Sequence, residues 1–368
     1  MSKTKGNATS RPRYVPYVKG FSPPTQRKRE EALGVDPGPE YLPGIDFFPP
    51  LAKCTSEDDW LAQYKPQSQP FDQYLRENPW LSTRPRKDSR APKKLTFIPE
   101  GKTLQEKYPG GAIYLMQLGH FKDDDPDFDA LLDYTRRFLC LPVKKLNIPN
   151  ASLVFEKTNV YWQYQVEAKG MLINQRIKVH ARFNKNSGRY QLSAMGCMDV
   201  LRPILPDDAL CLVALTMSDL FEDTPDLFIA GLAGGNHRLA VFSLFRYNPN
   251  LEFSTEFWHQ ITETKKFKQA ERKKLMLQRS CRLAVHEIMH LFGVDHCIYY
   301  ACCMNGSGHL GEDFQQPMFL CPIDLRKIQV LSNFNVCDRY KDLQEFFTNH
   351  GMADEAQWCE RRIKFIQE

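Results

Sequence analysis

Residues 286–296 contain three histidines and a glutamate at a spacing that suits a metal centre. They read His-Glu-Ile-Met-His-Leu-Phe-Gly-Val-Asp-His. On a helix, side chains four residues apart lie on one face, so His286 and His290 can offer ring nitrogens to one ion about 2 Å away. Gly293 can adopt the left-handed backbone conformation that ends a helix and turns the chain. We therefore expect His296 to return as a third ligand from outside the helix.

The chemistry of this residue set is that of metal-assisted hydrolysis. Three neutral imidazoles leave the fourth position of a zinc ion for water, which is typical of a catalytic site and not of a structural one. Glu287 follows the first ligand and can take the proton of that water during attack on an amide carbonyl, then pass it to the leaving nitrogen. Zinc would lower the pKa of the water towards ~7 and stabilise the developing oxyanion. The pattern predicts a zinc-dependent peptidase with Glu287 as general base.

The residues after the motif indicate which family of zinc peptidases the sequence resembles. A motif with a distal third histidine is typical of metzincins, in which a methionine turn lies beneath the metal. Met304, in the turn-like run after His296, is the expected Met-turn residue. Cys297 and Cys302 complete the pattern HExxHxxGxxHCx4CxM, and Cys321 opens a run similar to a CxxC motif. In these features the sequence resembles the archaemetzincin family, and its animal members in particular.

This resemblance implies a second, structural zinc ion bound by Cys297, Cys302 and Cys321. The fourth ligand of the family is the last cysteine of the CxxC motif, and Asp324 stands at that position here. A carboxylate oxygen binds zinc at a similar distance, so Asp324 is the expected fourth ligand.

Other outcomes stay open for the second zinc site. Cys303 or Cys337 could replace Asp324 as the fourth ligand, or the site could be weakened or empty.

Apolar periodicity predicts the elements that must position these residues. A long helix from Leu275 to Phe292 carries the motif and follows a basic stretch with helical potential, and mixed strands and helices indicate an α+β (mixed α/β) fold. The resemblance implies a metzincin-like catalytic domain with a twisted mixed sheet, an active-site helix, a Met-turn and a Cys-rich zinc-binding segment. In it, Leu239 to Leu244 would be the edge strand that lines the substrate channel. The other expected elements are a helix over 127–139, strands over 112–118, 143–148 and 210–217, a hairpin within 151–195, and helices over 338–349 and 353–367.

The chain divides into three expected parts. Residues 1–94 form a flexible leader with short helices and a basic linker, 95–349 form the catalytic domain, and 350–368 form a C-terminal helix. The leader is rich in Pro, Gly and charge and has few periodic apolar positions.

The composition and the N-terminal sequence are typical of a soluble intracellular protein. The 368 residues are 42% hydrophobic with a net charge of +5, the N-terminus has no apolar signal segment, and no apolar run approaches the roughly 20 residues of a membrane span. The 11 cysteines are an odd number, which favours reduced thiols over a disulfide scaffold. We therefore expect a cytoplasmic or nuclear protein that is not secreted. Its partners would be peptides or unfolded polypeptides, with no membrane.

Two other functions compete with this interpretation. The first is a catalytically weak zinc-binding protein that acts through partner binding, and the intact Glu287 and three histidines argue against it. The second is nucleic-acid binding through the cysteines and basic stretches, and a net charge of only +5 makes that partner unlikely.

Overall fold

A computed structural model gives the structure of the chain. It describes residues 21–368 apart from 45, 67, 87–94, 157–158, 169, 186–187, 223–227, 250 and 252–266. The helices are α1 (Gln26–Leu33), α2 (Trp60–Gln63), α3 (Phe71–Glu77), α4 (Leu104–Lys107), α5 (Phe128–Leu139), α6 (Ala194–Leu201), α7 (Gln269–Leu291), α8 (Leu310–Gln315), α9 (Pro322–Ser332), α10 (Val336–Asn349) and α11 (Ala353–Gln367). The strands are β1 (Ala112–Gln117), β2 (Val143–Lys145), β3 (Ser152–Glu156), β4 (Asn159–Ala168), β5 (Met171–Val179), β6 (Ala181–Asn184), β7 (Arg189–Ser193), β8 (Ala209–Thr216), β9 (Asp219–Phe221), β10 (Gly231–Gly234) and β11 (Leu239–Ser243).

A mixed five-stranded sheet with the order β10-β11-β8-β1-β2 forms the centre of the molecule. Its inner pairs are parallel, with Ile113 opposite Cys211 and Val241 opposite Ala214. Only β10 runs antiparallel to its neighbour, and it lies at one end of the strand order. The expected mixed α/β class is therefore confirmed.

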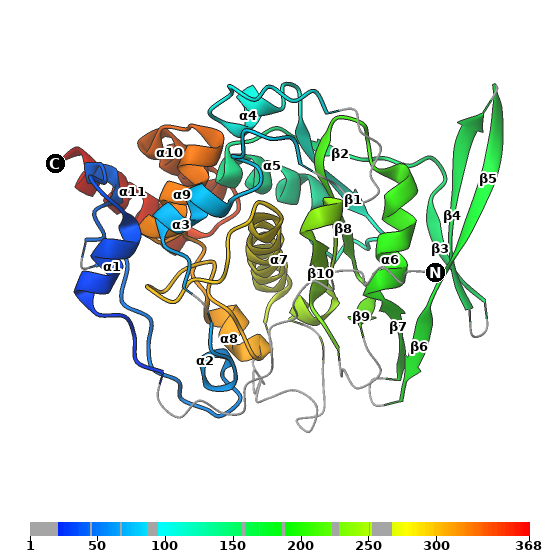
Figure 1. Ribbon diagram of the computed structural model, residues 1–368. Helices are drawn as coiled ribbons and strands as arrows, with labels where there is room; N and C mark the ends of the chain where they lie inside the picture. The colour runs from blue at the N-terminus through cyan, green and yellow to red at the C-terminus, as the bar shows by residue number, and fades with distance from the viewer. Residues whose placement is uncertain are drawn as a thin grey trace, which may run out of the picture.

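Two hydrophobic cores cover the two faces of this sheet, because alternate side chains of a strand point to opposite faces. In β8, Cys211 and Val213 face the larger core with α5 and α7, whereas Leu212 and Ala214 face the smaller core with α6. Figure 1 shows α7 near the middle of the molecule, with the sheet on one side of it and α9, α10 and α11 on the other. The helix with the histidine motif is thus enclosed by protein along most of its length.

Most of the expected elements lie close to their predicted positions. The helix over 127–139 is α5, the C-terminal helices are α10 and α11, and the interior strand over 210–217 is β8. The basic stretch before the motif is not a separate element, since α7 begins at Gln269 and runs without a break to Leu291. The expected hairpin region contains β3 to β7. Strands β3, β4 and β5 form one three-stranded sheet, and β6 and β7 form another together with β9.

The prediction for the edge strand was wrong. Residues 239–243 form β11, which is fully buried between β8 and β10, and Leu244 follows the strand. An apolar run of this kind fits an interior strand flanked on both sides, and the sequence offers no alternation that would mark an edge. The edge of the sheet is the glycine-rich β10.

The expected flexible leader also needs correction over the residues that the structure describes. Side chains from Ala32 to Trp80, among them Tyr41, Phe48 and Tyr74, belong to the main hydrophobic core. The segment carries few apolar residues and no periodic pattern, so the sequence does not signal that α1 and α3 pack on α9. Residues 1–20 of the leader and 87–94 of the basic linker lie outside the described residues.

Candidate metal centres

The three histidines of the motif converge, as the spacing predicts. His286 and His290 lie one turn apart on α7, and their Nε2 atoms are 3.1 Å apart. The helix ends at Phe292, and Gly293 takes φ +79°, which turns the chain back. His296 then places its Nε2 3.2 Å from that of His290.

Hydrogen bonds fix the tautomers of two of these rings. The Nδ1 of His286 lies 2.7 Å from the carbonyl oxygen of Cys303, and the Nδ1 of His290 lies 2.6 Å from that of Val294. A carbonyl oxygen only accepts, so each Nδ1 must carry the proton. Burial lowers the pKa of His286 to about 4 and that of His290 to about 3, so both rings are neutral near pH 7 and their Nε2 atoms are bare.

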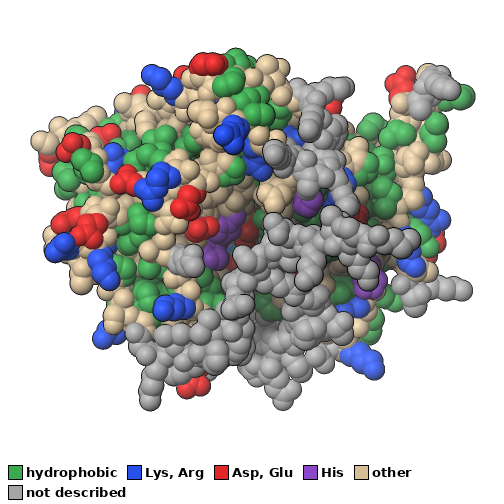
Figure 2. Space-filling model, viewed as in Figure 1, with side chains coloured by type: hydrophobic (Ala, Val, Ile, Leu, Met, Phe, Trp, Pro, Cys, Tyr) green, Lys and Arg blue, Asp and Glu red, His purple; other side chains and the backbone are tan. Residues whose placement is uncertain are grey.

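Two bare nitrogens 3.1 Å apart repel each other unless a cation lies between them. Tetrahedral zinc with Zn–N distances of about 2.05 Å places two ligand nitrogens about 3.3 Å apart, close to the observed spacing. The carbonyl bonds on the far side of the rings also match the usual support of metal-binding histidines. The donor set therefore fits a zinc ion. His290 and His296 are partly exposed, so solvent can reach the site. Figure 2 shows histidine side chains at the surface of one face of the molecule.

Glu287, next to the first histidine, is half-buried, and the acidic side chain of Asp313 lies near it. Burial raises its pKa to about 8, and the charge of Asp313 adds to this shift. The Asp313 carboxylate is buried and accepts a hydrogen bond from the hydroxyl of Tyr247. Sequence reasoning missed Asp313 and Tyr247, because nothing in a single sequence links them to Glu287, which is 26 and 40 residues away.

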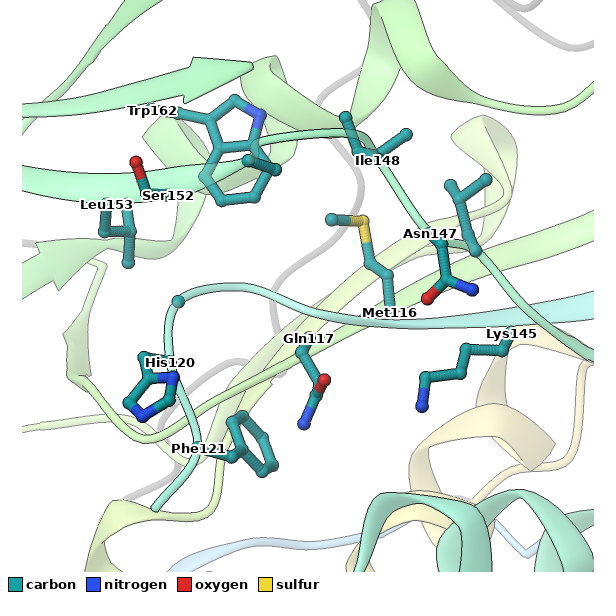
Figure 3. A pocket seen from close by; sticks show the side chains of 13 residues that line it. Met116, Gln117, His120, Phe121, Lys145, Asn147, Ile148, Ser152, Leu153 and Trp162 are labelled. Atoms are coloured by element: carbon teal, nitrogen blue, oxygen red, sulfur yellow. The ribbon is translucent and has the colours of Figure 1, made fainter. Parts of the chain in front are cut away.

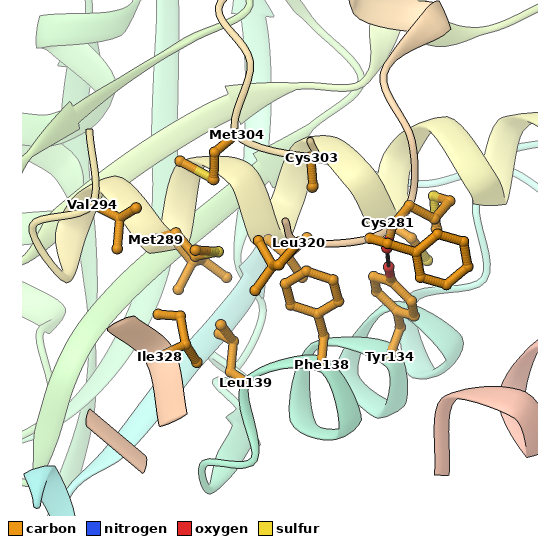
Figure 4. Close-up of a cluster of buried hydrophobic side chains, with 14 of the residues drawn as sticks. Tyr134, Phe138, Leu139, Cys281, Met289, Val294, Cys303, Met304, Leu320 and Ile328 are labelled. Carbon is orange, nitrogen blue, oxygen red and sulfur yellow. Dashed lines mark hydrogen bonds between the residues drawn. The ribbon is translucent and has the colours of Figure 1, made fainter. Parts of the chain in front are cut away.

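The turn that contains Met304 lies beneath the histidine site. The Met304 carbonyl accepts the N–H of Cys297, directly after the third histidine, at 2.7 Å. Asn305 stabilises the conformation of this turn, because its side-chain amide donates to the carbonyls of Cys297 and Tyr300 at 2.9 Å each. Figure 4 shows Met304 close to α7, next to Val294 and Met289. The placement suits the expected Met-turn.

A second group of buried ligand atoms comes from the expected cysteines. Sγ of Cys297 and Sγ of Cys321 are 3.6 Å apart, too far for a disulfide of about 2.05 Å and close to the roughly 3.8 Å expected around tetrahedral zinc. Oδ2 of Asp324 lies 3.3 Å from Sγ of Cys302 and 3.6 Å from Sγ of Cys321. The four ligand atoms lie within 4.8 Å of one another, a spacing that suits a zinc ion. We call these four residues the cysteine cluster.

Asp324 takes the fourth position of this cluster, and the two other candidates do not. Cys303, drawn in Figure 4, belongs to the main hydrophobic core and not to the cluster of ligand atoms. Cys337 lies on α10 and outside the cluster. Burial raises the pKa of Asp324 to about 6, and the neighbouring Lys327 opposes this shift.

The residues of the motif fall in a region that is similar to known proteins. The model of peptidase family M54 matches residues 256–330. Archaemetzincin-2 of Macaca fascicularis is 35% identical over 173 residues, which are 44% of this chain and 48% of that protein. Over these residues the chain is similar to the archaemetzincins. Human archaemetzincin-1 is 28% identical over 179 residues, 45% of this chain and 36% of that protein. The chain spans about half the length of the archaemetzincin-2 relatives that it matches.

A solved archaemetzincin structure was also compared. The crystal structure of the archaemetzincin from Methanopyrus kandleri aligns at 20% identity, covering 63% of this chain and 97% of that one. Its TM-score of 0.37 is too low to establish a shared fold.

An N-terminal segment closes the end of the motif helix in this chain. Trp80 donates its indole N–H to the carbonyl of Leu291 at 2.8 Å, and Asn78 donates its amide to the carbonyl of Phe292 at 2.8 Å. The last carbonyls of a helix have no partner within the helix, so these bonds satisfy groups that would otherwise be buried unpaired. Trp60 packs edge-on against His296, with the ring centroids 4.7 Å apart.

Two other polar features lie outside the two metal centres. Asp59, His309 and Glu312 gather near the N-terminus of α8, and backbone amides occupy an oxygen of each carboxylate, so these residues tie the N-terminal segment to the motif loop. A cavity between the ends of β1 and β2 and the β3–β4 hairpin is lined by Gln117, His120 and other residues (Figure 3). None of its lining residues belongs to the histidine triad or the cysteine cluster.

Proposed function

We propose that this chain is a zinc-dependent peptidase whose catalytic zinc is held by His286, His290 and His296. The observation that carries the proposal is the convergence of three imidazole nitrogens, two of which must be bare because their opposite nitrogens donate to carbonyls. The match of residues 256–330 to the model of peptidase family M54 supports the peptidase class. The chain spans only about half of its archaemetzincin-2 relatives, so the activity is inferred from this site.

The chain's own residues supply most of the chemistry. A bound zinc ion would polarise the scissile carbonyl and acidify water at the open position. Glu287 accepts the proton of the attacking water and delivers it to the leaving nitrogen, and its raised pKa suits a group that must both take and give a proton near neutrality. The buried Asp313 lies close enough to Glu287 for its charge to disfavour the ionised carboxylate.

The substrate class is an extended peptide or an unfolded polypeptide. β10 lies at the edge of the central sheet and packs near α7, and its sequence Gly-Leu-Ala-Gly presents little side-chain bulk. A substrate can add to such an edge as a further strand through main-chain hydrogen bonds. Peptides methylated on the backbone nitrogens next to the scissile bond should then be cleaved poorly.

The second ion would be structural and would lie in the cysteine cluster, with Asp324 as the fourth ligand. Metal analysis of the purified protein tests this directly. We expect two zinc equivalents per chain in the wild type, one in Asp324→Ala, and two again in Asp324→Cys.

Glu287→Gln tests the catalytic assignment, because it keeps the size of the side chain and removes the base. We expect the variant to retain two zinc ions and to lose cleavage of a broad peptide library that the wild type cleaves. Cleavage that persists in this variant would disprove the assignment of Glu287. A fully zinc-loaded wild type that cleaves nothing would favour a zinc-binding protein that acts through partners.

We also propose an intracellular location. All 11 cysteines are free thiols in the structure, which suits a reducing compartment. Among the described residues, no helix has the length and apolar character needed to cross a membrane.

A further inference from the structure

Gln69 contacts both regions that carry the metal centres. Its Nε2 donates to the carbonyl of Gly293 at 2.9 Å, and its Oε1 accepts the backbone N–H of Asp295 at 3.1 Å. The same Oε1 accepts from Nζ of Lys327 at 3.0 Å. Gly293 and Asp295 form the turn that carries His296, so one side chain holds this turn and also contacts a residue next to the cysteine cluster.

Lys327 continues the connection into the cluster. Its Nζ donates to Oδ1 of Asp324 at 2.8 Å, while Oδ2 of the same carboxylate faces Cys302 and Cys321. Gln69, Lys327 and Asp324 are only 8%, 2% and 1% exposed. Polar groups this deeply buried keep their partners, because an unmade bond is not replaced by water. The bonds therefore form one continuous chain between the two centres.

We propose that Gln69 and Lys327 form a bridge that couples the two metal centres, so that metal in the cysteine cluster raises the metal affinity of the histidine triad. A cation in the cluster attracts Oδ2 of Asp324 and so gives Oδ1 a fixed position. Lys327 then holds Gln69, and Gln69 holds the turn in the conformation that places His296 beside His290. The inference rests on the proposed metal sites but does not require peptidase activity.

A second route between the centres is covalent, since Cys297 directly follows His296. The two routes make different predictions for a double-mutant cycle. If the bridge carries the coupling, removal of Gln69 must abolish it. If the backbone between His296 and Cys297 carries it, removal of Gln69 must leave it unchanged.

The cycle uses the full-length protein with Co²⁺ as the probe ion. Cobalt bound to thiolates gives a ligand-to-metal charge-transfer band that cobalt bound to histidines lacks, so the two sites can be titrated separately. The four proteins are wild type, Cys321→Ser, Gln69→Met and the double variant. We expect Cys321→Ser to weaken cobalt binding at the histidine triad at least about fivefold, the lower end of usual coupling between sites. In the Gln69→Met background the same change should have an effect of less than about twofold.

The reverse measurement is an independent check, because coupling between two binding sites is reciprocal. His290→Ala should lower the cobalt affinity of the cysteine cluster in the wild type but not in Gln69→Met. Gln73→Met is the matched control. Gln73 lies on α3, bonds to Glu77 at 3.0 Å and contacts neither centre, so it should leave both effects intact.

Two results would overturn the bridge. An equal effect of Cys321→Ser with and without Gln69 would assign the coupling to the backbone, and no effect in the wild type would make the centres independent. If circular dichroism shows that Gln69→Met does not fold, Lys327→Met breaks the same bridge from its other end and must also abolish the coupling. None of these readouts measures cleavage, so an inactive protein with coupled sites would refute only the proposed function.

Discussion

The contact between Trp80 and the end of α7 allows a sharp test of how the N-terminal segment supports the active site. Trp80 is 1% exposed, and its N–H bonds the carbonyl of Leu291 at 2.8 Å. Trp80→Phe keeps an aromatic ring but leaves this carbonyl without its donor. An unsatisfied buried acceptor costs about 1–3 kcal/mol, and the missing ring volume adds about 1 kcal/mol. We expect the free energy of unfolding to fall by about 2–4 kcal/mol.

Trp162→Phe is a control of matched chemistry. Trp162 is also 1% exposed, but its Nε1 is buried with no hydrogen-bond partner among the described residues. The control therefore loses ring volume and removes an unsatisfied donor, and it should lower the free energy of unfolding by about 1 kcal/mol or less.

Urea denaturation of the zinc-loaded proteins measures both changes. Thermal melting should show the same order, with about 2 °C lost per kcal/mol in a chain of this size. A Trp80→Phe variant that is no less stable than Trp162→Phe would refute the view that the indole N–H secures the helix end.

Three further predictions follow from single contacts. Gly293→Ala should cost about 1–2 kcal/mol, because alanine is strained at φ +79°, and should lower the zinc content measured by metal analysis. Arg246→Met should cost about 3–5 kcal/mol in urea denaturation, because it leaves the buried Asp219, bound through two contacts of 2.6 Å, without its cation. Burial raises the pKa of Glu287 to about 8, so the metal-free carboxyl keeps its proton at pH 7 and should release it when zinc binds.

The sign of the last prediction can be checked by calorimetry. A raised carboxyl pKa makes the ionised form unfavourable, so the metal-free protein should lose stability as the pH rises from about 4.5 to about 8. Zinc binding should be weaker below pH 8 than above it. Titrations in two buffers of different protonation enthalpy count the released protons, and Glu287→Gln should release one fewer than the wild type near pH 7. An equal count in both proteins would contradict the raised pKa.

The metal-binding motif could be predicted from the sequence because its geometry depends only on residues close together in the chain. Helical periodicity alone brings His286 and His290 to one face, and a glycine at the helix end is enough to predict the return of His296. The cysteine cluster could also be predicted from the sequence, since its members span only residues 297–324. The position of Asp324 in that cluster follows from its place one turn into α9, three residues after Cys321.

The prediction failed where burial depends on partners distant in sequence. The apolar run of β11 does not say which strand flanks it, and only the pairing of β10 with it decides which strand lies at the edge. The segment before residue 94 looked like a leader because its aromatic residues are isolated along the chain. Trp80 is nevertheless fully buried, since its binding surface is the end of α7, some 200 residues later.

The sequence by itself determined the metal-binding motif, the probable ligands of both ions and the helix that carries the first two histidines. These follow from short-range geometry, which 3.6 residues per turn and one glycine already define. Only the tertiary structure decided that Gln69, Trp80 and Lys327 join an N-terminal segment to the two centres. Such contacts depend on how the chain packs over long separations, and no periodicity in a single sequence records that.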